Sequence, residues 1–215
     1  MHIKIFGIQR TGTNYLEFLI RSNVLLADSP VILNDVPFTR DHFPGWKHEA
    51  VPVVDVDEQQ RRLANNIAVI LIKNPYTWYK SIRRWTRGTE KFSFDGFGGR
   101  DPEHFFKQYN SLYADHKKLL IGEKRDTVYE HSALIRYEDL ILNPRKEIYK
   151  FAVKFNLTIE GKFSDTNRAV QSRVFTESMR TYYLAQKPDY SADIVERVNE
   201  AVDWELMRFY GYEKI

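Results

Sequence analysis

In the segment HIKIFGIQRTGTNYLEFLIRSN (residues 2–23), an apolar run ends in a glycine-bracketed loop and leads directly into a helical pattern. Gly7 and Gly12 lie five positions apart, as in the phosphate-binding loop pattern G-x-x-x-x-G-K-[ST]. Thr13, however, stands where that pattern needs lysine, and Asn14 stands where it needs a hydroxyl. The segment therefore predicts a strand, a tight turn and a helix, in which the loop lacks the lysine and the magnesium ligand of an ATP site.

Two further apolar runs, IAVILIK (67–73) and SALIRYE (132–138), are each followed by a helical pattern. The first is almost continuously apolar, as expected for a strand buried on both faces of a parallel sheet. PVILND (30–35) is a weaker strand candidate. The alternation of strands and helices predicts an α/β fold in which a central parallel sheet is flanked by helices on both faces.

The C-terminal segment ADIVERVNEAVDWELMRFYGY (192–212) has a helical apolar pattern. One stripe of this helix is expected to contain Val195, Val198, Val202, Leu206 and Phe209. Gly211 is the natural stop of the helix.

The composition is that of an ordinary globular protein: 215 residues, 43% of them hydrophobic, with a net charge of +3. We expect one domain over residues 1–215. The small net charge argues against a nucleic-acid-coating protein, and the lack of cysteine excludes disulfides and cysteine metal sites. Neither a secretory signal nor an 18-residue apolar span is recognised, so we expect a cytoplasmic protein without a membrane span.

Ligands of parallel α/β sheets bind beyond the carboxyl ends of the strands, which directs attention to residues 7–14, 73–76 and 138–144. The first loop opens into a helix and is dense in donors, among them Arg10, Thr11 and Thr13. It is predicted to bind a phosphate ester. The alternative is a glycine-containing connection that binds nothing.

The second loop combines a lysine, a helix N-terminus and a serine. Asn74 is the expected N-cap and Pro75 the first helical residue, with Lys73 entering from the strand and Ser81 on the same helix face as Asn74. One phosphate could therefore meet Lys73, the helix N-terminus and Ser81. A well-capped helix with a solvated Ser81 is the alternative.

The third loop begins with Tyr137, Glu138 and Asp139. The acidic pair could hold magnesium in a nucleotidase, or it could cap loops and pair with arginines. Tyr137 could stack on a base or belong to the core. His48 is a candidate general base only if the fold places it beside the first loop.

Taken together, these segments resemble the sulfotransferases that use 3′-phosphoadenosine 5′-phosphosulfate (PAPS). The hexapeptide Arg10 to Tyr15 looks like their 5′-phosphosulfate loop, and Lys73-Asn74-Pro75, with Ser81 eight residues after Lys73, resembles their 3′-phosphate motif. Tyr137-Glu138-Asp139-Leu140 matches a Tyr-Glu-Asp-Leu segment of the family. Lys47-His48 is similar to the Lys-x-His that carries the catalytic histidine in cytosolic members, without its intervening residue.

The resemblance implies a three-layer P-loop NTPase-like fold and sulfuryl transfer from PAPS to a hydroxyl or amine of a small-molecule or glycan acceptor, without a metal. The implied catalytic residues are Arg10 and His48. The implied cofactor-binding residues are Arg10, Thr11, Gly12, Thr13, Asn14, Lys73, Ser81, Tyr137 and Arg173.

Two departures from the family bear on the 3′-phosphate. Lys73 replaces the usual arginine, which weakens a bidentate grip. The family's C-terminal Arg-Lys-Gly segment is missing, and RAVQSRVFTESMR (168–180) lies where it might be replaced, which makes Arg168, Arg173 and Arg180 candidates.

Two other classes of function stay open from the sequence. One is a divergent P-loop kinase or nucleotidase in which Glu138 or Asp139 holds magnesium. The other is a non-catalytic nucleotide-binding or interaction protein. The sequence does not predict the acceptor or the oligomeric state.

Overall fold

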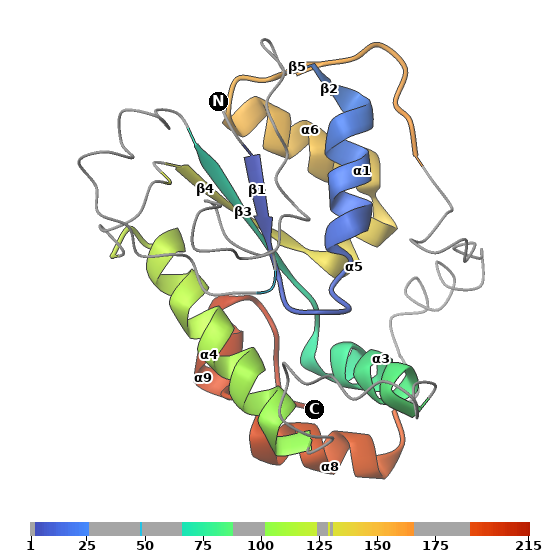
Figure 1. Cartoon of the computed structure of the whole chain (residues 1–215), viewed down its shortest axis with the longest axis vertical. Coiled ribbons are helices and arrows are strands. Elements are labelled where there is room, and N and C mark those ends of the chain that lie inside the picture. Colours follow the sequence, from blue (N-terminus) through green and yellow to red (C-terminus); the bar gives the residue numbers. More distant parts are fainter. Residues whose placement is uncertain are drawn as a thin grey trace, which may run out of the picture.

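The computed structural model describes residues 3–25, 48, 66–87, 102–123, 129, 131–165 and 190–215. Within these residues, a central sheet lies between two groups of helices (Figure 1). None of the helices in these ranges is long and apolar enough to cross a membrane.

The central sheet contains β1 (Ile3–Phe6), β3 (Ile67–Ile72) and β4 (His131–Arg136). Its order is β1-β3-β4 and both pairs are parallel, with Ile3 opposite Ile67 and Ile67 opposite His131. The three strongest strand predictions are thus confirmed. The fourth candidate, residues 30–35, lies outside the described residues.

A short antiparallel pair, β2 (Val24–Leu25) with β5 (Thr158–Ile159), was not expected from the sequence. Its strands have two residues each, too few for a recognisable alternation of apolar and polar side chains.

The helices that follow the strands are α1 (Thr13–Asn23), α3 (Pro75–Arg87), α5 (Tyr137–Leu142) and α6 (Pro144–Lys154). The remaining helices are α4 (Pro102–Leu120), α8 (Ala192–Ala201) and α9 (Trp204–Phe209). As Figure 1 shows, α1, α5 and α6 gather on one side of the sheet, and α4 and α9 on the other.

The fully buried strand β3 divides the core into two apolar clusters. Alternate residues Ala68, Ile70 and Ile72 pack with side chains of α3, α4, α8 and α9. The intervening residues of β3 pack with side chains of α1, α5 and α6. This period-two alternation buries both faces of the strand, as expected for the middle of a parallel sheet. The predicted α/β class, a parallel sheet between two helical layers, is confirmed.

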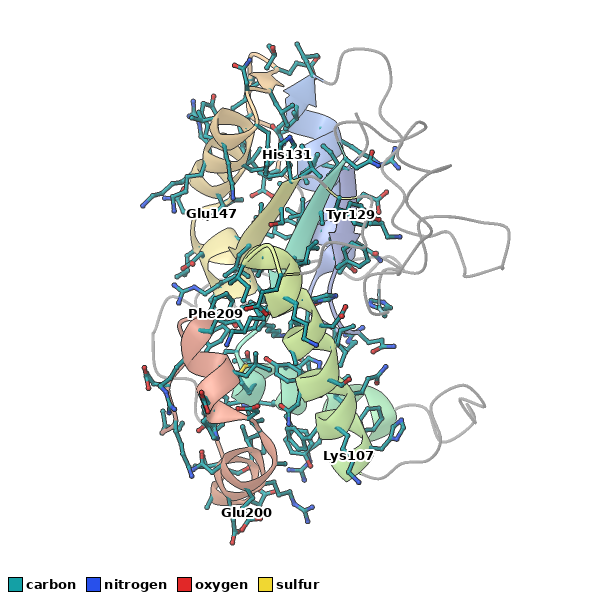
Figure 2. All side chains as sticks on the ribbon, turned by 90° about the vertical axis from the view of Figure 1, so that its left-hand side faces the viewer. Lys107, Tyr129, His131, Glu147, Glu200 and Phe209 are labelled. Atoms are coloured by element: carbon teal, nitrogen blue, oxygen red, sulfur yellow. The ribbon has the colours of Figure 1, made fainter. Side chains whose placement is uncertain are left out.

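The expected single helix over residues 192–212 is wrong, because the structure has two helices there. Asp203 has an extended backbone and caps α9, its side chain accepting from the N–H of Leu206 at 2.9 Å. Because a new helix begins at Trp204, the side chains that face the core differ from those expected for one continuous helix. Met207 is buried, whereas Phe209, placed in the predicted apolar stripe, lies at the surface and is 39% exposed (Figure 2).

Candidate functional site

The candidate site lies where the three strands of the central sheet end. β1 ends before Gly7, β3 before Lys73 and β4 before Tyr137. The ring of Tyr137 packs against Gly12 of the first loop, and the Nζ atom of Lys73 lies 4.7 Å from the centre of the same ring. The structure therefore brings together the three strand ends that the strand-end rule indicates, although the third, expected as a loop over residues 138–144, begins helix α5 at Tyr137.

Gly7 allows the first loop to pass close to the end of β3. A Cβ atom at this position would lie 2.6 Å from the carbonyl oxygen of Leu71 and 2.8 Å from Oγ1 of Thr11. The Thr11 hydroxyl is buried and donates to the carbonyl of Ile8 at 2.6 Å. Thr11 therefore shapes the turn, and its predicted contact with a phosphate stays a prediction.

Gly12 is required at the start of α1 for two reasons. Its φ is +92°, in the left-handed region, and a Cβ atom would lie 2.4 Å from the Tyr137 ring. Because glycine at the N-cap has no side chain, it caps none of the N–H groups in the first turn of α1. Helix N-termini that bind anions present their N–H groups in this way. Thr13 is buried in this turn and Asn14 is half-buried.

Arg10 is an exposed residue of the first loop with a left-handed backbone, at φ 69°. Such a conformation is strained for a residue other than glycine, and strained residues cluster at ligand-binding sites. The charge of Arg10 also helps to lower the pKa of Lys73. The two predicted phosphate-binding cations therefore act on each other across the site.

Lys73 and Ser81 form the direct pair that their spacing predicts. The Lys73 side chain is buried, and its Nζ donates to Oγ of Ser81 at 2.9 Å. Burial lowers the pKa of Lys73 from 10.5 to about 8; Glu138 opposes this shift and Arg10 adds to it. A buried ammonium next to a hydroxyl can bind a phosphate, although contact with a 3′-phosphate stays a prediction.

The N-terminus of α3 is capped as predicted. Pro75 is the first helical residue, and Oδ1 of Asn74 accepts from the N–H of Tyr76 at 3.0 Å. The N–H of Asn74 donates to Oε1 of Glu138 at 3.0 Å, and the Thr77 hydroxyl donates to the same oxygen at 3.2 Å. These internal bonds occupy donors that the sequence suggested for a phosphate, so anion binding here depends mainly on the lysine–serine pair.

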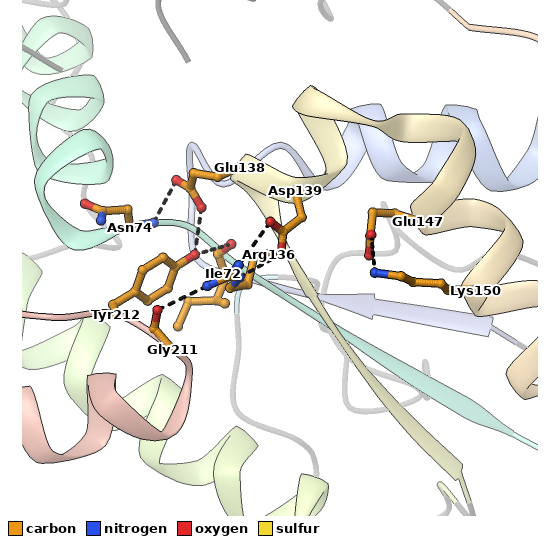
Figure 3. Close-up of polar contacts among 9 residues, drawn as sticks. All are labelled: Ile72, Asn74, Arg136, Glu138, Asp139, Glu147, Lys150, Gly211 and Tyr212. Carbon is orange, nitrogen blue, oxygen red and sulfur yellow. Dashed lines mark hydrogen bonds and ion pairs between the residues drawn. The ribbon is translucent and has the colours of Figure 1, made fainter. Parts of the chain in front are cut away.

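The acidic residues after β4 have structural partners (Figure 3). Oε2 of Glu138 accepts from the Tyr212 hydroxyl at 2.7 Å, and Asp139 accepts two hydrogen bonds from Arg136, at 2.7 and 3.0 Å. These contacts favour the interpretation in which the acidic pair caps loops and pairs with arginine. Within the described parts of the chain, no cluster of three or more His, Asp or Glu residues could hold a metal ion.

His48 lies beside the first loop, the condition under which it becomes a candidate base. Its Nδ1 atom lies 2.5 Å from the carbonyl oxygen of Gly7. A carbonyl can only accept, so we assign the proton to Nδ1, which makes Nε2 the proton acceptor in the neutral ring. This tautomer is the one a general base needs, and the catalytic role itself stays a prediction.

Tyr137 and Arg173 complete the predicted set. Tyr137 is buried and lies between Gly12 and Lys73; stacking on a base stays a prediction. Arg173, with its alternatives Arg168 and Arg180, lies outside the described residues.

Three tyrosines that support the site were missed. Tyr109 donates to the carbonyl of Lys73 at 2.7 Å, Tyr113 to that of Leu71 at 3.0 Å, and Tyr212 to Glu138. The four-residue spacing of Tyr109 and Tyr113 indicates one buried helix face, but no sequence signal identifies the oxygens that their hydroxyls reach.

Comparisons with known proteins show a distant likeness to a solved structure. No family model matches the sequence, and no curated protein matches it. The structure is similar to the crystal structure of a sulfotransferase from Alicyclobacillus acidocaldarius, with a TM-score of 0.42 and 14% sequence identity, over 96% of this chain and 98% of that chain. A likeness at this level carries no argument about activity.

Proposed function

We propose that this protein is a PAPS-dependent sulfotransferase that transfers a sulfuryl group to a hydroxyl or amine of a small-molecule or glycan acceptor. The observation that carries the proposal is the meeting of two cationic elements at one sheet edge. One is the glycine-bracketed loop with Arg10, and the other is the buried pair Lys73–Ser81. His48 lies against the first of them.

The residues fit a nucleotide with phosphates at both the 5′ and the 3′ position. The first loop offers the N-terminus of α1 and a guanidinium for the 5′ end. The pair Lys73–Ser81 offers an ammonium and a hydroxyl for the 3′ end. ATP with magnesium fits less well, because the loop lacks the lysine of an ATP site and Glu138 and Asp139 are bonded within the chain.

PAPS supplies the sulfuryl group and leaves as 3′,5′-adenosine bisphosphate once the acceptor has taken that group. Arg10 holds the negative charge that grows on the 5′-phosphate, and because its guanidinium keeps its proton it acts through charge. His48 takes the acceptor's proton at Nε2, while the carbonyl of Gly7 holds Nδ1–H. Lys73 and Ser81 bind the 3′-phosphate and orient the nucleotide.

Thermal unfolding with three ligands tests the proposal. Without metal, 3′,5′-adenosine bisphosphate is expected to raise the unfolding temperature more than adenosine 5′-monophosphate, and more than ATP with magnesium. A larger effect of ATP with magnesium would support a kinase or nucleotidase instead. Binding of the bisphosphate without sulfuryl transfer to any member of a broad acceptor panel would support a non-catalytic binding protein.

A further inference from the structure

Glu138 connects three parts of the molecule that border the lysine–serine pair. Its Oε1 accepts from the backbone N–H of Asn74 and the hydroxyl of Thr77, both at the start of α3. Its Oε2 accepts from the hydroxyl of Tyr212, after α9. Figure 3 shows the carboxylate between Asn74 and Tyr212. One side chain at the start of α5 thus ties the C-terminal segment to the N-terminus of α3.

Tyr212 is itself held in place on both sides. The carbonyl of Gly211, the preceding residue, accepts from Nη1 of Arg136 at 3.1 Å. Further along the chain, the N–H of Ile215 donates to the hydroxyl of Tyr76, the second residue of α3, at 3.0 Å. Burial raises the pKa of Tyr212 well above its usual value, so its hydroxyl remains a donor at physiological pH.

Glu138 also acts on Lys73 through its charge. Among the described residues, the charged groups that act on this ammonium are Glu138, which favours its protonation, and Arg10, which opposes it. The neutral groups near Lys73 include the hydroxyl of Ser81, the Tyr137 ring and Tyr109, which donates to the Lys73 carbonyl. Glu138 is therefore a carboxylate that compensates part of the cost of burying this lysine.

We propose that Glu138 and Tyr212 are positioning residues for the 3′-phosphate end of the site: Tyr212 holds the carboxylate, and the carboxylate holds the first turn of α3 next to Lys73. This inference rests on the proposed function. It adds to it a connection from the C-terminal segment to the nucleotide site. Neither residue is expected to touch the reacting atoms.

The first test compares two ligands that differ only in the 3′-phosphate. Calorimetry with 3′,5′-adenosine bisphosphate and adenosine 5′-monophosphate gives two dissociation constants. The dissociation constant of the monophosphate divided by that of the bisphosphate measures the contribution of the 3′-phosphate. Tyr212→Phe is expected to lower this ratio by at least about threefold, with little change in the affinity for the monophosphate. Loss of overall stability alone would weaken both ligands and leave the ratio unchanged.

Tyr210→Phe is the matched control. Tyr210 is also a buried tyrosine beside α9, but its hydroxyl donates to the carbonyl of Tyr113 at 2.6 Å rather than to Glu138. This variant loses a comparable hydrogen bond and is expected to keep the wild-type ratio.

The second test needs no nucleotide. Nuclear magnetic resonance of isotope-labelled lysine follows the titration of Lys73, whose signal is assigned by its loss in Lys73→Arg. Glu138→Gln removes the charge that favours protonation and leaves burial and Arg10, both of which lower the pKa. The pKa of Lys73 is therefore expected to fall below the wild-type value of about 8. Tyr212→Phe keeps the carboxylate and is expected to leave this pKa near 8.

The outcomes separate this inference from the proposed function. A wild-type ratio well above one that Tyr212→Phe leaves unchanged would overturn the positioning role and leave the sulfotransferase proposal standing. A wild-type ratio near one would overturn both. An unchanged or raised pKa of Lys73 in Glu138→Gln would overturn the electrostatic part, whatever the nucleotide measurements give.

Discussion

Replacing Gly12 by alanine tests whether the first loop and the start of α5 depend on each other. Gly12 has a φ of +92°, and a Cβ atom there would lie 2.4 and 2.7 Å from two atoms of the Tyr137 ring. Separations below about 3 Å between such atoms do not persist, so the ring must move. The Nζ atom of Lys73 lies 4.7 Å from the centre of that ring, so a displaced ring is expected to disturb the lysine as well.

The magnitude follows from two separate terms. Forcing a residue with a Cβ atom into the left-handed region destabilises the folded state by about 1–2 kcal/mol. The overlap with a buried ring adds about 1–3 kcal/mol, the usual range for overpacking. The total for Gly12→Ala is therefore about 2–5 kcal/mol in the free energy of unfolding.

Gly122→Ala is the control that separates the two terms. Gly122 has a similarly positive φ of +74°, but a Cβ atom there would have nothing within 4 Å. Urea unfolding followed by tryptophan fluorescence is expected to show Gly12→Ala as the less stable of the two variants by about 1–3 kcal/mol, the overlap term alone. Calorimetry is expected to show weaker binding of 3′,5′-adenosine bisphosphate by Gly12→Ala only.

Equal free energies of unfolding in the two variants would refute this reasoning, because they would leave no measurable overlap between position 12 and the Tyr137 ring. A large loss of stability in Gly12→Ala with unchanged nucleotide binding would refute the expectation that a displaced Tyr137 ring disturbs Lys73. In that case the ring could move without disturbing Lys73.

Four further predictions concern the candidate catalytic and binding residues. The affinity for 3′,5′-adenosine bisphosphate is expected to fall by about tenfold per pH unit above pH 8, because Lys73 has a pKa of about 8 and must then take up a proton to bind a phosphate. Lys73→Arg should show no such fall. A decline of affinity in that variant too would exclude Lys73 as the cause. His48→Gln is expected to lower the rate of transfer to hydroxyl acceptors by about 10²–10⁴-fold with unchanged nucleotide affinity; equal losses of both would indicate a binding role. Arg10→Ala is expected to lower kcat by about 10²-fold or more, and full activity would remove Arg10 from the mechanism. Arg10→Gly, which relieves the left-handed backbone at φ 69°, is expected to be about 1 kcal/mol more stable than Arg10→Ala in urea unfolding.

The sequence predicts much of the fold because the relevant signals are local. The run IAVILI of β3 is apolar at every position, and such a run has few alternatives to a fully buried strand. Asn74 and Pro75 have strong positional preferences at a helix start, and they occupy these positions. Once the strands are known to be parallel, their carboxyl ends must meet at one edge, which brings the candidate loops together.

The contacts that support the site could not be predicted, because they join distant segments. Tyr212 and Glu138 are 74 positions apart, and neither the turn after α9 nor the spacing of aromatic residues indicates that they meet. The break between α8 and α9 was missed for a different reason. In the sequence, the apolar periodicity continues across the break. The side chain of Asp203 caps a new helix there, and this capping leaves no gap in the apolar pattern.

The supporting structure is compatible with a lysine at position 73. The buried ammonium has the hydroxyl of Ser81, the face of the Tyr137 ring and the charge of Glu138 around it. An arginine carries five N–H donors in a planar fork, and each buried donor needs an acceptor. The lysine gives up bidentate binding of a phosphate but fits a small polar site that it can share with the protein's own carboxylate. Binding of a phosphate and protonation of Lys73 favour each other. A bound 3′-phosphate must therefore raise the pKa of this lysine, and the free energy of that shift equals the free energy that protonation adds to phosphate binding.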